Sequence, residues 1–182
     1  MMEYIIGIDP GLKGGIAFYN PNGLVVFATP TFEVDFIKKV KGKSKKSKRN
    51  EMDLIGAARL ILDISSEHRI QCAYLEHVTA GKGQGVTGMF RFGQNFGQWQ
   101  GLLAGLNIRT ELVRPQIWKQ SCNLIGTDKN ASRELAKERY PNHVDNFRLV
   151  KQDGLAEATL IGQYGWEKEH DSTDETGPVN VE

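Results

Sequence analysis

Cysteine is scarce in this chain, which has only Cys72 and Cys122 among its 182 residues. Two cysteines cannot form a disulfide framework or a zinc-binding set, and we expect both to be small core or surface residues. The four histidines lack the spacing of zinc ligands. Such sparing use of cysteine is typical of a reducing compartment, so we expect a cytoplasmic protein.

Long apolar runs and cofactor fingerprints are missing as well. No unbroken apolar segment reaches the length of a membrane-spanning helix. The N-terminal residues lack the basic and apolar regions of a signal peptide. No Walker A sequence or Rossmann fingerprint is present, so we expect no organic cofactor and no membrane partner. The hydrophobic content of 40% is nevertheless enough for one core, which excludes a fully disordered chain.

Charge is balanced in total but unevenly distributed. The net charge is +1, yet residues 38–49 hold eight basic residues and no acidic one, a local charge of +8. Residues 167–182 hold six acidic residues and one lysine. We therefore expect one domain over residues 1–166, a lysine-rich insertion at 38–50 and an acidic, disordered tail at 167–182. Two interpretations of the basic run stay open, namely contact with an anionic partner and a mobile, solvated segment.

The order of apolar segments and turns predicts an α/β fold of the ribonuclease H-like class. Turns of sequence Asp-Pro-Gly and Asn-Pro-Asn-Gly separate three short apolar runs, which predicts three antiparallel strands. Helices then alternate with two strands that run parallel to the first. The expected strands are 4–8, 15–19, 24–28, 71–78 and 109–113, and the expected helices are 52–65, 90–106, 130–139 and 153–166. This is a mixed five-stranded sheet flanked by helices.

Four acidic residues stand where this fold would bring them together. Asp9 ends the first strand and Glu76 ends the parallel strand beside it, so both should lie at the same edge of the sheet. Asp153 and Glu157 are four residues apart and share one face of the last helix. Each acid also has an ordinary structural interpretation, as a turn, strand-end or helix-terminus residue.

As a set, these four carboxylates predict a metal-dependent catalytic site. Carboxylate oxygens are the ligands that Mg²⁺ and Mn²⁺ prefer. Two such ions about 4 Å apart can activate a water and stabilise the leaving oxygen during phosphodiester hydrolysis. We therefore expect Asp9, Glu76, Asp153 and Glu157 to be both the catalytic residues and the ligands of two Mg²⁺ ions, which Mn²⁺ could replace.

Glycine recurs every four residues in the helix expected at 90–106. The positions are Gly93, Gly97, Gly101 and Gly105. Each glycine costs roughly 1 kcal/mol relative to alanine inside a helix, so a stripe of four indicates close approach by another backbone. That backbone could belong to the protein's own sheet or to the same helix of a second subunit.

Several of these segments together resemble the RuvC family of Holliday junction resolvases. The similar segments are Ile6-Gly7-Ile8-Asp9-Pro10-Gly11, Gly14-Gly15-Ile16-Ala17, Tyr74-Leu75-Glu76, Gly93-Gln94, Val113-Arg114-Pro115, Gly126-Thr127-Asp128-Lys129 and Asp153-Gly154-Leu155-Ala156-Glu157-Ala158. The resemblance spans roughly residues 3–165. The small size and the divergent C-terminal motif resemble phage or viral members, for which the cytoplasm is that of a bacterial host.

The resemblance implies a homodimeric, Mg²⁺-dependent endonuclease that resolves four-way DNA junctions by paired nicks. It favours dimerisation through the glycine-striped helix. Lys119 and Lys129 match basic positions near the scissile strand. The expected DNA contacts are Lys13, Lys82, Arg91, Lys119 and Lys129. A related nuclease acting on flaps or RNA–DNA hybrids and a nucleic-acid binder without catalysis remain the alternatives.

Two features depart from the family pattern. The family usually has two aspartates three residues apart in the last helix, whereas Asp153 and Glu157 are four apart. The family also places an aromatic residue soon after the second acid. Here that stretch is Thr79-Ala80-Gly81-Lys82, and Phe90 or Phe92 could substitute.

Overall fold

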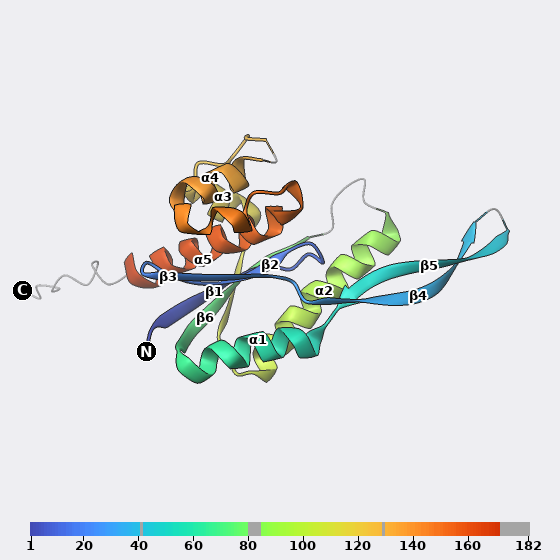
Figure 1. Ribbon diagram of the computed structural model, residues 1–182, viewed down its shortest axis with the longest axis horizontal. Coiled ribbons are helices and arrows are strands. Elements are labelled where there is room, and N and C mark those ends of the chain that lie inside the picture. The colour runs from blue at the N-terminus through green and yellow to red at the C-terminus, as the bar shows by residue number, and fades with distance from the viewer. Residues whose placement is uncertain (41, 80–84, 129, 172–182) are drawn as a thin grey trace, which may run out of the picture.

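A mixed five-stranded sheet forms the centre of the protein (Figure 1). The computed structural model describes residues 1–40, 42–79, 85–128 and 130–171. The strand order is β3-β2-β1-β6-β7. The strands are β1 (Glu3–Asp9), β2 (Gly15–Asn20), β3 (Gly23–Ala28), β6 (Arg69–Glu76) and β7 (Thr110–Val113). β1, β2 and β3 pair antiparallel, while β1–β6 and β6–β7 are parallel. The ribonuclease H-like prediction is thereby confirmed.

Strand β1 is the central strand because its apolar side chains are covered on both faces. Ile5, Ile6 and Ile8 are completely buried. The parallel register pairs Ile8 with Leu75, the residue before Glu76. Strands β1 and β6 therefore end at the same edge of the sheet.

Helices cover both faces of the sheet (Figure 1). Helices α1 (Leu54–Glu67) and α2 (Val86–Gly105) lie on one face. Helices α3 (Pro115–Ser121), α4 (Ala131–Arg139) and α5 (Asp153–Asp171) lie on the other, with the short 3-10 helices η1 (Pro141–Asn146) and η2 (Val150–Gln152) before α5. Helix α5 lies directly on the sheet because glycine is present at the contact. A Cβ atom at Gly7 would lie only 2.1 Å from the carbonyl oxygen of Ala158.

Helix α2 begins at Val86, four residues before the predicted start, and further helical features also differ from the sequence prediction. Helix α3 was not expected, because Pro115 was interpreted only as the end of a strand. Proline is also common at the first position of a helix, where its missing N–H needs no partner, and Pro115 occupies that position. Helix α5 continues to Asp171 instead of ending at Trp166. The rest of the predicted acidic tail, residues 172–182, lies outside the described residues.

The lysine-rich insertion is an ordered β-hairpin that projects from the body (Figure 1). Strands β4 (Thr31–Val40) and β5 (Lys43–Met52) pair antiparallel along their whole length as a separate two-stranded sheet. The described residues of 38–49 therefore lie in paired strands and are mostly exposed, and both interpretations of the basic run stay predictions. Apolar and acidic residues alternate over 32–36, a pattern typical of a strand, whereas the lysine-rich sequence of β5 has no such alternation.

The glycine stripe of α2 faces away from the sheet. A Cβ atom added at any of the four positions would meet no described atom within 4 Å. On the opposite side of the helix, Trp99 and Leu103 are completely buried. The interpretation that the stripe packs on the protein's own sheet is thus wrong. Over the described part of the chain, no helix is long and apolar enough to cross a membrane.

Candidate active site

Asp9 ends β1 beside the turn that leads to β2. Its carboxylate accepts a hydrogen bond from the backbone N–H of Gly11, with 3.0 Å between Oδ1 and N. The N–H of Gly14 donates to the carbonyl of Gly11 and closes the turn. The turn therefore fixes Asp9 at the sheet edge, with one carboxylate oxygen left for other partners.

Glu76 ends β6 and is almost completely buried, with 7% of its surface exposed. The indole Nε1 of Trp118 donates a hydrogen bond to Glu76 Oε1 at 3.0 Å. Trp118 is itself fully buried on α3. Because a buried carboxylate without a partner is costly, this contact positions Glu76 and partly compensates for its burial.

The first turns of α5 bring Asp153 and Glu157 to the same edge. A Cβ atom at Gly154 would lie 2.4 Å from backbone atoms of both Lys13 and Gly14. Only glycine fits this approach, so the start of α5 lies directly against the β1–β2 turn. Glu157 accepts contacts from Lys119 Nζ at 3.0 Å and from Ser132 Oγ at 3.3 Å.

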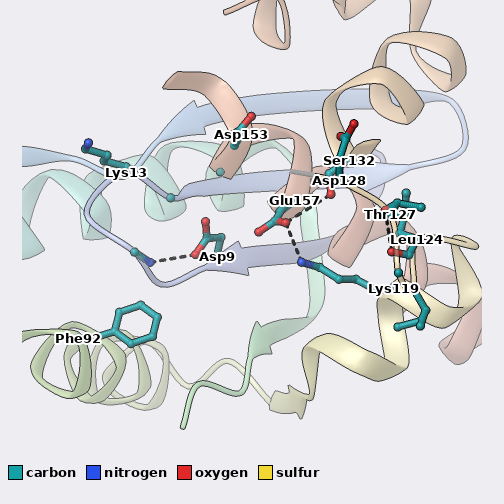
Figure 2. A pocket seen from close by; sticks show the side chains of 15 residues that line it. Asp9, Lys13, Phe92, Lys119, Leu124, Thr127, Asp128, Ser132, Asp153 and Glu157 are labelled. Atoms are coloured by element: carbon teal, nitrogen blue, oxygen red, sulfur yellow. Dashed lines mark hydrogen bonds and ion pairs between the residues drawn. The ribbon is translucent and has the colours of Figure 1, made fainter. Parts of the chain in front are cut away.

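These elements enclose a cleft of about 630 Å³. Figure 2 shows the carboxylates of Asp9 and Glu157 pointing toward each other, with Lys119 reaching Glu157 from α3. Asp153 lies above them, and Lys13 and Phe92 stand at the rim (Figure 2). Glu76 instead lines an adjacent cavity of about 480 Å³, which shares Phe92 with the first.

The pKa values of Asp9 and Glu76 are raised by burial and by neighbouring acids. Burial, reinforced by the charge of Glu157, raises the pKa of Asp9 to about 6, although the Gly11 N–H and Lys119 oppose the shift. Burial and the charge of Asp9 raise the pKa of Glu76 to about 7, with Glu157 adding to the shift and Trp118 and Lys119 opposing it. Asp9, Glu76 and Glu157 therefore form one coupled set of carboxylates.

The chemistry of this set fits a divalent cation, but its present spacing does not hold one. Carboxylates that raise one another's pKa repel when ionised, and a hard cation between them would relieve that repulsion. Within the described ranges, no three acidic, histidine or cysteine side chains stand close enough together to hold a metal ion. Mg²⁺ is commonly held by one or two carboxylates together with water and substrate phosphates, so Asp9 and Glu157 could supply ligands if Glu157 released Lys119.

Asp153 is held differently from the other three acids. The Nε of Arg133 on α4 lies 2.5 Å from Asp153 Oδ1, without the alignment of a hydrogen bond, so the contact is an ion pair. The Arg133 side chain is only 6% exposed, whereas that of Asp153 is 40% exposed. This arginine, the indole of Trp118 and the hydroxyl of Ser132 are site contacts that the sequence analysis did not predict. Nothing in the sequence pattern marked Arg133, since only the packing of α4 on α5 brings it to Asp153.

The predicted DNA contacts separate into three groups. Lys13 and Lys119 line the acidic cleft. Arg91 lies outside it, on the part of α2 that faces the base of the β4–β5 hairpin. Lys82 and Lys129 fall outside the described residues. Of the two candidate aromatic residues, Phe92 lines the cleft, whereas the side chain of Phe90 is 74% exposed and does not.

The raised pKa values predict how the stability of the metal-free protein varies with pH. A carboxyl with a raised pKa binds more protons in the folded state than in the unfolded state. Stability contributed by Asp9 and Glu76 is therefore lost as the pH rises from about 4 through the folded values of about 6 and 7. In EDTA, we expect a melting temperature several degrees lower at pH 8 than at pH 5. Glu76→Gln should flatten this dependence, and an equally steep profile in the variant would contradict the assignment.

No family model and no curated protein matches the sequence. Among solved structures, the chain is similar to T. thermophilus RuvC in complex with a Holliday junction substrate. That match has a TM-score of 0.50 and 10% identity over 93% of this chain and 96% of the other. A further structure of Thermus thermophilus RuvC has a TM-score of 0.49 and 12% identity, over 90% of this chain and 94% of the other. At 10% identity, the first match shows that the two chains share the ribonuclease H-like fold.

Proposed function

We propose that this protein is a metal-dependent endonuclease that resolves four-way DNA junctions by paired nicks. The observation on which the proposal rests is the coupled set of Asp9, Glu76 and Glu157 at one edge of a ribonuclease H-like sheet. The cleft beside them also contains two lysines that can approach phosphates, Lys13 and Lys119. The fold similarity to RuvC supports the choice of a branched substrate.

The proposed cofactor is Mg²⁺, with two ions per site and Mn²⁺ as a substitute. When bound, the ions would activate a water and stabilise the leaving oxygen of the phosphodiester. The chain's own residues hold the geometry. The indole of Trp118 positions Glu76, and the Gly11 N–H positions Asp9. Lys119, which pairs with Glu157 in this structure, could release that carboxylate and contact a substrate phosphate.

Asp9, Glu76, Asp153 and Glu157 are the proposed catalytic acids, and Glu157 ranks above Asp153 as a metal ligand. Glu157 contributes to the raised pKa values of both Asp9 and Glu76. Asp153 contributes to neither, and Arg133 already neutralises it. We assign Asp153 the weaker interaction with metal and a larger part in holding α4 against α5.

The proposed active species is a homodimer formed through α2. The outer face of this helix is smooth at its four stripe glycines, which open to solvent in the single chain. A four-way junction has two scissile strands related by approximate two-fold symmetry, and a two-fold dimer offers one active site to each.

The function is tested by incubating the full chain with a synthetic four-way junction, a flap, an RNA–DNA hybrid and a plain duplex. We expect paired nicks in the junction with Mg²⁺ or Mn²⁺ and none with EDTA. Cleavage of the flap or the hybrid in preference to the junction would favour the related nuclease instead. Junction binding with no cleavage in either metal would indicate a binder without catalysis.

A further inference from the structure

The β4–β5 hairpin has an anchored base and a free distal half. At the base, Met52 is buried in the main core, and the N–H of Asp53 donates to the carbonyl of Pro30. Beyond the base, the hairpin has few contacts with other helices and strands among the described residues. Ten residues per strand give a ribbon about 30 Å long. The anchored base therefore sets the direction in which a long, otherwise unsupported ribbon projects (Figure 1).

Cations near the base are neutralised, whereas those of the distal half are not. Lys48 pairs with Glu33 at 2.6 Å, and Arg49 pairs with Glu51 at 2.6 Å. The lysines of the distal half are all exposed and have no ion pair among the described residues. They are Lys38, Lys39, Lys43, Lys45 and Lys46.

The pairing register places like charges against one another. Lys38 stands directly opposite Lys45, an arrangement that destabilises an isolated hairpin. Two-stranded hairpins are marginally stable at best without other support. A ribbon that keeps five unpaired lysines at its unsupported end is therefore suited to a polyanion, which would neutralise them.

Both faces of the ribbon carry lysines. Cross-strand pairing puts Lys38, Lys43 and Lys45 on one face. The same register puts Lys39 and Lys46 on the other. A two-stranded ribbon fits the major groove of a B-form duplex, which is about 12 Å wide and has phosphates along both walls. Lysines on both faces suit this groove better than a flat anionic surface, which could contact only one face.

The hairpin base connects with the acidic cleft through the β1–β2 turn. Leu12 lines a small recess together with Arg49 and Met52 of β5 and Arg91 of α2. The next residue, Lys13, lines the acidic cleft. The hairpin extends from the same side of the molecule as the N-terminal end of α2 (Figure 1). A duplex that leaves the cleft past Lys13 would thus meet the ribbon.

We propose that the distal half of the hairpin binds in the major groove of a duplex arm of the substrate held at the acidic cleft. This inference rests on the proposed function, because it takes branched DNA as that substrate. The hairpin adds an interaction surface that contacts DNA about 30 Å from the hairpin base. Because this contact needs a continuous duplex arm, the affinity for a junction depends on the length of that arm.

The test uses the full chain with two double variants, Lys38→Gln/Lys45→Gln on one face and Lys39→Gln/Lys46→Gln on the other. Binding is measured over a salt series on junctions with arms of about 25 base pairs and of about 8 base pairs, the latter only about 27 Å long. On long arms, each double variant should lose about 10-fold in affinity, and its salt slope should fall by about 2. On short arms, both variants should bind like the wild type.

A control variant, Arg59→Gln/Arg69→Gln, removes the same charge from α1 and from the amino end of β6 and should leave both junctions unaffected. Equal losses on long and short arms, or no loss on either, would overturn the inference. The result is independent of cleavage. If the wild type cuts no junction in Mg²⁺ while the variants lose long-arm binding selectively, the proposed function fails and the hairpin assignment stands.

Discussion

Asp9→Asn should abolish nicking of four-way junctions while leaving junction binding nearly unchanged. Asparagine can keep the hydrogen bond from the Gly11 N–H, so the turn should stay intact. The change removes a charged oxygen ligand from the coupled set of carboxylates, and we expect the single-turnover cleavage rate to fall by about 10³-fold or more. Binding should persist because it rests on contacts of lysine and arginine with phosphates.

The matched control is Asp63→Asn, the same substitution at an exposed position on α1. It should cleave at the wild-type rate. Asp9→Asn should also melt several degrees higher than the wild type at pH 8 in EDTA, because it removes a buried charge with a raised pKa. A variant that cleaves near the wild-type rate in Mg²⁺ would show that Asp9 is not part of the active site.

Gly97→Leu should convert a dimer into a folded monomer that no longer makes paired nicks. A side chain at this position meets no described atom of its own chain within 4 Å, and leucine favours the helix more than glycine does. The single chain should therefore tolerate the change. A dimer in which two α2 helices touch through their glycines should not tolerate the change, because a branched side chain would hold the two backbones apart.

Sedimentation and circular dichroism together test this outcome. The variant should sediment as a chain of 20.3 kDa with unchanged helix content, and its two nicks in one junction should become uncoupled. Gly88→Leu is the control, since Gly88 is also open on α2 but lies off the stripe. A Gly97→Leu protein that still sediments as a dimer would exclude the α2 interface, as would a wild type that is already monomeric.

The sheet could be predicted because its signals are local. The apolar run of β1 ends at Asp-Pro-Gly, and the turn at Asn20 ends β2, so each boundary is marked by residues at that boundary. The hairpin and α3 were not predicted, for two different reasons. The lysine-rich strand β5 has little apolar alternation to detect, so the alternation in β4 had no visible partner strand. Pro115 is equally compatible with the end of a strand and the start of a helix.

The composition and the order of apolar segments and turns along the chain thus determined the fold class. They also placed Asp9 and Glu76 at one edge of the sheet, because neighbouring parallel strands end together. They could not determine what each acid contacts. Trp118 holds Glu76 because α3 lies against the end of β6. Lys119 holds Glu157 and Arg133 holds Asp153 because α3 and α4 lie against α5. Partners distant in sequence meet only after the core has closed, so tertiary packing decided the ionisation of the site and the outward direction of the glycine stripe.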